Sequence, residues 1–131
     1  MGTWLNHLSR RIADHIRRPE YNAMYLEQHP KEQDIERGMI YIVQSRGYPK
    51  WAYLRCPCPK QDVIRLSLLE SRTPSWRVTL DKRQRPTLSP SIRQLDGCYS
   101  HFWISSGRVQ WCRDSGKRWS ANREKSSSAH R

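Results

Sequence analysis

The sequence has few apolar residues and no long hydrophobic run. Of its 131 residues 36% are hydrophobic, phenylalanine occurs once, and the mean hydropathy is −0.93. No apolar stretch approaches the roughly 20 residues that cross a bilayer, which excludes a membrane-spanning helix. The first residues, MGTWLNHLSRR, lack the apolar core of a secretory signal. We therefore expect a cytoplasmic protein that has no membrane partner.

Glycine and proline are also scarce, at six and eight residues, which excludes a fibrous or low-complexity chain. In contrast, the sequence has six Trp and six Tyr, and such side chains are unfavourable to leave in water. Complete disorder is therefore excluded. The length allows one domain with short appendages.

Acidic residues are half as frequent as basic ones, at 12 against 24, so the formal net charge is +12. Residues 1–34 are neutral, residues 35–113 carry net +9, and residues 114–131 carry net +3. Most of the excess lies in the part that also holds the cysteines. This indicates a folded basic surface that faces a nucleic acid or an acidic protein, or else one that only keeps the protein soluble.

Apolar periodicity divides the chain in two. Residues 3–18 have Leu5, Leu8, Ile12 and Ile16 on one face of an amphipathic helix, and a second short helix is predicted over residues 20–28. Residues from 35 onward favour strands. The predicted fold is α+β but mainly β: an N-terminal helix and a small antiparallel meander of about seven short strands, over residues 39–45, 51–56, 63–69, 75–80, 87–92, 99–105 and 108–112.

These features predict three regions. Residues 1–34 form an N-terminal helical extension, and residues 35–113 form the β domain. Residues 114–131 are basic and show no periodicity, so we expect a disordered tail.

Four cysteines, Cys56, Cys58, Cys98 and Cys112, lie at predicted strand ends or in loops. Because disulfides are rare inside cells, these thiols suit a tetrahedral structural zinc better, and the ion would stabilise a small core. Two alternatives remain: a site in which His101 joins Cys56, Cys58 and Cys98, and no metal at all.

His101 is the only histidine in residues 35–113, and a lone strand histidine is most often structural. However, Ser89 and Ser91 are two residues apart in a neighbouring predicted strand, so both could face the imidazole. A serine beside a neutral histidine can act as a nucleophile. G-x-S-x-G, P-loop, G-x-G-x-x-G and H-E-x-x-H motifs are absent. The sequence does not select a third group among Asp96, Asp81 and Glu70.

Six stretches resemble, in the right order, a family of small bacterial zinc-containing proteins of formerly unknown function. Members are encoded in ubiquitin-like conjugation operons beside E1-like and E2-like proteins. One departure is visible: the family often reads Cys-Pro-Cys-Gly-Cys, whereas this chain has Cys56-Pro57-Cys58-Pro59-Lys60. The matching stretches are residues 34–43, 51–58, 63–69, 74–80, 86–92 and 97–112.

The resemblance implies a zinc-stapled β fold and a serine protease that processes the C-terminus of a ubiquitin-like precursor, removes it from conjugates, or both. The implied partners are a ubiquitin-like protein, through its C-terminal tail, and E1-like or E2-like proteins. The implied catalytic residues are His101 and either Ser89 or Ser91. If His101 is the base it cannot also hold zinc, which favours Cys112 as the fourth ligand.

Two readings without catalysis compete with this one. In the first, the protein is a zinc-binding module whose Trp and Tyr side chains stack on nucleic-acid bases while its basic residues follow the phosphates. In the second, it is an adaptor that binds an acidic ubiquitin-like, E1-like or E2-like partner.

Overall fold

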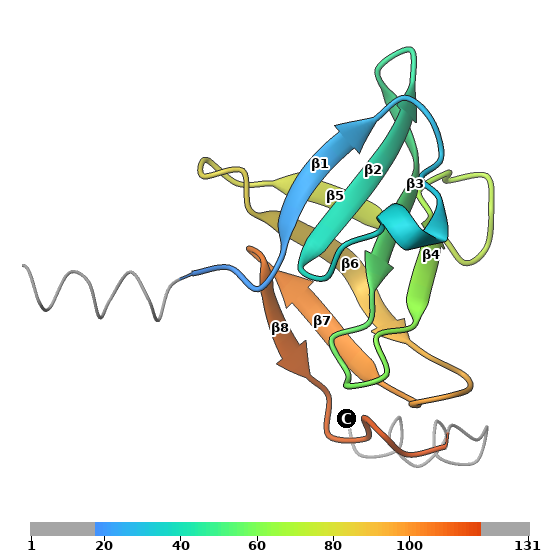
Figure 1. Cartoon of the computed structure of the whole chain (residues 1–131), viewed down its shortest axis with the longest axis vertical. Helices are drawn as coiled ribbons and strands as arrows, with labels where there is room; N and C mark the ends of the chain where they lie inside the picture. Colours follow the sequence, from blue (N-terminus) through green and yellow to red (C-terminus); the bar gives the residue numbers. More distant parts are fainter. Residues whose placement is uncertain (1–17, 119–131) are drawn as a thin grey trace, which may run out of the picture.

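The computed structural model describes residues 18–118, so the helix predicted over residues 3–18 falls almost wholly outside the described part. The described chain forms two four-stranded sheets (Figure 1). The first contains β1 (Asn22–Leu26), β2 (Met39–Ser45), β3 (Tyr48–Arg55) and β4 (Val63–Ser67). The second contains β5 (Arg77–Leu80), β6 (Pro86–Arg93), β7 (His101–Ser105) and β8 (Arg108–Trp111).

In each sheet the strands lie side by side in chain order. All neighbouring strands are antiparallel except β1 and β2, which are parallel. The mainly β prediction is therefore confirmed, but the single meander is two small sheets. Residues 18–118 contain one short 3-10 helix, Glu32–Asp34. No helix in this part of the chain is long and apolar enough to cross a membrane.

The short helix predicted over residues 20–28 is wrong, because this segment holds strand β1. Its residues pair in register with β2, from Asn22 opposite Met39 to Leu26 opposite Val43. Just before it, the Tyr21 N–H donates to the Gly107 carbonyl at 2.9 Å, and the Tyr21 side chain is 2% exposed in the core. Tertiary pairing therefore overrides a weak local preference for helix.

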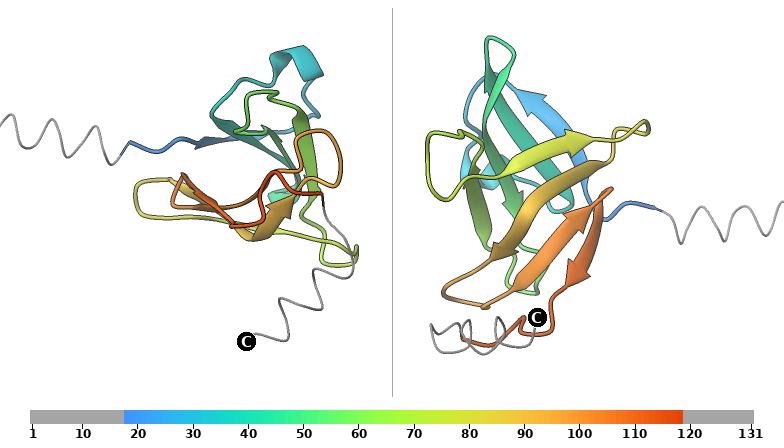
Figure 2. Two further views of the ribbon diagram at one scale, coloured as in Figure 1. Left: turned by 90° about the horizontal axis from the view of Figure 1, so that it is seen from below. Right: turned by 180° about the vertical axis from the view of Figure 1, so that it is seen from behind.

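The main core lies between the two sheets, which are stacked as two layers (Figure 2). Alternate residues of β2, β3, β4 and β7 point inward, and the interrupted strand β6 contributes Leu88 and Ile92. The inward side chains are at most 6% exposed: Ile40, Ile42, Ala52, Leu54, Ile64 and Leu66 from the first sheet, and Leu88, Ile92, Phe102 and Ile104 from the second.

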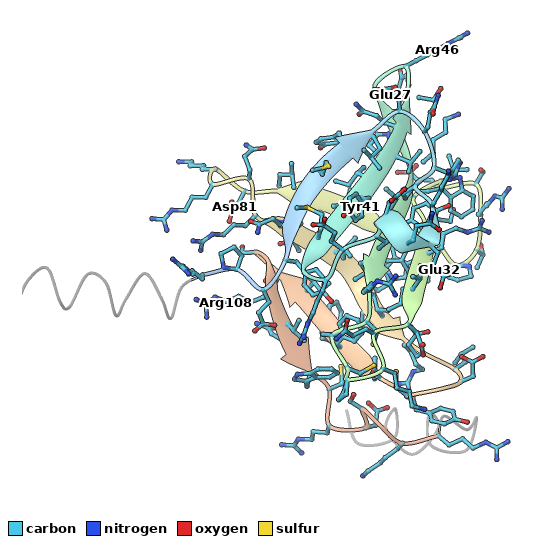
Figure 3. All side chains as sticks on the ribbon, in the orientation of Figure 1. Glu27, Glu32, Tyr41, Arg46, Asp81 and Arg108 are labelled. Carbon is cyan, nitrogen blue, oxygen red and sulfur yellow. The ribbon has the colours of Figure 1, made fainter. Side chains whose placement is uncertain are left out.

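The outer face of the first sheet is also covered, by the segment that contains the 3-10 helix. Tyr41 points toward this segment from β2 (Figure 3), where its hydroxyl donates to the Asp34 carbonyl at 3.2 Å and accepts the Glu36 N–H at 3.0 Å. Ile35 and Val43 are buried beside it. Strand β2 is thus buried on both faces, which explains why its sequence is a continuous apolar run rather than an alternating one.

Candidate active site and cysteine cluster

The centre of β6 leaves the regular ladder at the Ser-Pro-Ser sequence. Leu88 pairs with Ile104 and Ile92 pairs with Phe102, so the three residues 89–91 lie opposite the single residue Trp103 of β7. Pro90 has no N–H to give to a ladder, which suits an interruption at this point. The irregularity changes the direction of the side chains on either side of Pro90.

Only one of the two candidate serines contacts the histidine. Ser91 Oγ lies 2.9 Å from His101 Nε2, and the His101 side chain is 14% exposed at the start of β7. Ser89 instead lies opposite Arg77 of β5 and is exposed. The structure therefore separates the pair that the sequence left equivalent.

The second imidazole nitrogen contacts a carboxylate that was not among the candidates predicted from the sequence. His101 Nδ1 lies 2.6 Å from Asp114 Oδ1, and the other carboxylate oxygen, Oδ2, accepts a hydrogen bond of 2.9 Å from Arg93. Burial opposes ionisation of this carboxyl, but the hydrogen bonds from His101 and Arg93 outweigh it, so the pKa of Asp114 lies below its ordinary value.

An ionised Asp114 can only accept hydrogen bonds, which fixes the direction of the whole chain. Nδ1 of His101 must carry the proton and donate it to Asp114. In the neutral imidazole, Nε2 then has a free lone pair that can accept the Ser91 hydroxyl proton. Serine, histidine and aspartate are thus joined in the order, and with the polarity, that base-assisted attack by a serine requires.

Asp114 is held by a series of turns that follow β8. The Ser115 N–H donates to Cys112 O at 3.0 Å, and the Gly116 N–H donates to Tyr99 O at 2.8 Å. Ser115 Oγ accepts the His101 N–H at 3.0 Å. Residues 114–116 therefore pack on the start of β7, although the sequence assigned them to a disordered tail. The Asp-Ser-Gly sequence, which is rich in turn-forming residues, is the signal that would have found this turn.

The three acidic residues considered from the sequence are engaged elsewhere. Asp81 Oδ1 accepts the N–H groups of Arg83 and Arg85 in the β5–β6 turn. Glu70 forms an exposed ion pair with Arg77, at 3.7 Å. Asp96 accepts the Tyr99 N–H through its main-chain carbonyl.

Three of the four cysteines lie together where the two sheets meet. The sulfurs of Cys56, Cys58 and Cys98 lie within 4.8 Å of one another, and those of Cys56 and Cys98 are 3.7 Å apart. Cys56 and Cys58 come from the loop after β3, whereas Cys98 comes from the loop between β6 and β7. A metal ion bound here would link one sheet to the other.

The chemistry of this cluster suits a thiophilic ion such as zinc. Burial raises the pKa of the Cys56 thiol to about 12. Burial also disfavours the Cys58 thiolate, but hydrogen bonds from Cys56 and Cys98 outweigh it and lower its pKa. A bound cation would favour the thiolate at all three positions. The three cysteines could therefore hold a metal ion.

The fourth predicted ligand, Cys112, does not belong to this group. Its N–H donates to His101 O at 2.9 Å, which places Cys112 at the open end of the β7–β8 hairpin, away from the turn at Ser106 and Gly107. Its sulfur lies instead within 4.8 Å of ligand atoms of His101 and Asp114. His101 is likewise grouped with Asp114 and Cys112 rather than with the three cysteines.

A cavity of about 350 Å³ opens beside the Ser-Pro-Ser segment. Trp76 connects it to the serine, since its indole Nε1–H donates to the Ser91 carbonyl at 3.3 Å. Half-buried apolar side chains and an exposed ion pair share its wall. The lining residues are Pro49, Leu68, Glu70, Ser75, Trp76, Arg77, Val78 and Ser89.

A hydrogen-bonded Ser–His–Asp set beside a cavity is the arrangement typical of serine hydrolases, and here it lies on a fold of two small β sheets. The family model described as bacterial ubiquitination-like system serine protease (BubE) matches residues 25–112. The chain belongs to this family. The matched region contains Ser91 and His101 and ends two residues before Asp114. No curated protein and no solved structure matches the chain significantly.

Proposed function

We propose that the protein is a serine peptidase that cleaves the bond after the C-terminal tail of a ubiquitin-like protein, in precursors, in conjugates or in both. The observation that carries the proposal is the continuous chain of contacts from Ser91 through His101 to Asp114. The family supplies the setting, a bacterial ubiquitination-like system.

In this mechanism, Ser91 Oγ attacks the carbonyl carbon after the tail while His101 Nε2 takes the hydroxyl proton. The imidazolium then gives this proton to the departing amine, and the tail remains as an ester on Ser91. Water attacks the ester, again with His101 as the base, and releases the tail as a free carboxylate. Asp114 keeps the Nδ1 proton in place and stabilises the imidazolium throughout.

Substrate binding falls to the cavity beside Ser89, because Trp76 joins its wall to the main chain of Ser91. A flexible tail is a suitable occupant, since an extended chain can lie along β5 and place side chains in the cavity. Glu70 and Arg77 at the cavity offer partners to polar tail residues of either charge. The three-cysteine cluster takes no part in the chemistry and would act as a structural metal site.

The test is cleavage of a ubiquitin-like protein that carries a C-terminal extension and comes from the same bacterial system. Mass spectrometry should show release of the extension by the wild type and a loss of at least roughly 10³-fold in kcat for Ser91→Ala. Ser89→Ala is the matched control: Ser89 lines the cavity, so KM can change, but kcat should stay within a few-fold because His101 contacts Ser91 and not Ser89. Equal loss in both variants, or undiminished cleavage by Ser91→Ala, would contradict the assignment.

A further inference from the structure

A second set of metal-ligating side chains overlaps the triad. His101, Cys112 and Asp114 each offer a ligand atom that lies within 4.8 Å of the other two. All three side chains are partly exposed, so an ion can reach them from solvent. Imidazole, thiolate and carboxylate together form a donor set that suits Zn²⁺ rather than Mg²⁺ or Ca²⁺.

We propose that this second set is an inhibitory zinc site, in which Zn²⁺ binds His101, Cys112 and Asp114 and reversibly switches off the serine. The proposal rests on the proposed function for its effect, but the site itself needs only the geometry. Cys112, which sequence reasoning assigned to the structural cluster, then has a role beside the triad.

Inhibition follows from the two imidazole nitrogens. Nε2 is engaged by the Ser91 hydroxyl, whereas Nδ1 faces Asp114. Nδ1 is therefore the nitrogen available to a metal ion. An ion on Nδ1 displaces the proton from this nitrogen, so the neutral imidazole carries its one proton on Nε2 instead. That nitrogen can then donate to Ser91 but can no longer accept its proton, so the serine has no base. Cys112 releases its thiol proton to solvent on binding, and no group is oxidised or reduced.

The surroundings indicate a weaker site than the three-cysteine cluster. Nδ1 and Oδ1 are 2.6 Å apart, whereas two ligands of a tetrahedral zinc are about 3.3 Å apart, so Asp114 must shift. Its side chain is 39% exposed, which allows the shift. Arg93 holds the other oxygen at 2.9 Å and leaves Oδ1 for the ion, but its positive charge opposes a second cation. The two sites should therefore fill at different free zinc concentrations.

The experiment compares the full-length wild type with Cys112→Ser, each against its own rate at the lowest free zinc. A fluorophosphonate probe reports the reactivity of Ser91 without any ubiquitin-like substrate. As buffered free Zn²⁺ rises, we expect the wild-type labelling rate to fall at least tenfold and to return on chelation. Cys112→Ser should need at least tenfold more zinc for the same effect, and Mg²⁺ should do nothing.

Equilibrium dialysis with metal analysis of the same two proteins provides a readout that needs no activity. At high free zinc the wild type should bind one more ion per chain than Cys112→Ser. Cys112→Ala is a second variant at the same position and should behave like Cys112→Ser. If both variants bind as much zinc as the wild type and are inhibited at the same free zinc concentration, the proposal is wrong. If the wild type binds the extra ion but its Ser91 is never labelled, the proposed function fails while the site stands.

Discussion

At the scale of single residues, the candidate site depends on an ionised Asp114. Asp114→Asn nearly preserves the shape, but an amide can donate to Nδ1 and so stabilise the tautomer that leaves Nε2 protonated. We expect kcat to fall by roughly 10²–10⁴-fold with little change in KM. The measurement is steady-state cleavage of the extended ubiquitin-like substrate.

Asp96→Asn is the matched control for this change, because Asp96 lies in the loop after β6 and accepts the Tyr99 N–H through its main-chain carbonyl. It should keep kcat within about twofold. A similar loss in both variants would mean that Asp114 contributes only through folding.

The sequence predicted that a serine lies beside His101, but it did not decide between Ser89 and Ser91, and it did not indicate Asp114 as the third group. Ser89 and Ser91 are equivalent in a regular strand, and the shift in register at residues 89–91 that separates them depends on pairing with β7. Asp114 was missed because charge and composition place it in the tail, whereas two hydrogen bonds fold this segment back onto the start of β7: the His101 N–H donates to Ser115 Oγ, and the Gly116 N–H donates to the Tyr99 carbonyl. Such contacts between distant segments have no periodic signal.

At the scale of elements, strands with strong alternation were predictable and β1 was not. Residues 63–66 and 101–105 alternate between buried and more exposed positions. Strand β1 shows no such alternation, and it joins the sheet through parallel pairing with β2. The sequence could not predict two sheets rather than one, because the break between β4 and β5 depends on how the two sheets pack against each other around the core.

The β5–β6 turn carries a carboxylate whose charge stabilises the hairpin next to the Ser-Pro-Ser segment. Hydrogen bonds from the Arg85 and Arg83 N–H groups lower the pKa of Asp81 below its ordinary 3.8. A lowered pKa in the folded state means that the stabilisation is complete above about pH 4 and is lost as the pH falls through the folded value.

Asp81→Asn retains an acceptor oxygen without the charge, so it isolates this effect. Thermal unfolding should give a lower Tm for the variant than for the wild type at pH 7, and the difference should shrink below about pH 4. A difference that is constant with pH would show that the charge of Asp81 contributes nothing.

At the scale of the whole molecule, the net charge of +12 should act on encounter with an acidic protein substrate. Salt screens such attraction, since the Debye length is about 8 Å at 0.15 M. We expect kcat/KM for an acidic ubiquitin-like substrate to fall several-fold between low and moderate salt, mainly through KM. A neutral peptide with the same tail sequence should show little change; equal salt dependence for both would argue against docking of the whole protein.

The three-cysteine cluster of Cys56, Cys58 and Cys98 connects the two sheets, so the stability of the fold should depend on a metal ion held there. Each cysteine lies in a loop, and the loops belong to different sheets, so an ion held by these thiolates would restrain both layers at once. Binding energy of a structural zinc contributes directly to folding free energy. Removal of zinc with a strong chelator should therefore lower Tm by more than about 10 °C, because roughly 1 kcal/mol corresponds to 4–8 °C in a domain of this size.

Cys98→Ser should melt at the temperature of the chelated wild type and no longer respond to chelator. Cys112→Ser is the matched control, because Cys112 lies beside His101 and Asp114 rather than in the three-cysteine cluster. At low free zinc it should melt like the wild type and retain the full response to chelator. If Cys112→Ser loses as much metal-dependent stability as Cys98→Ser, then all four cysteines hold one ion, as their arrangement in the sequence suggested, and Cys112 is not available to a second site at the triad.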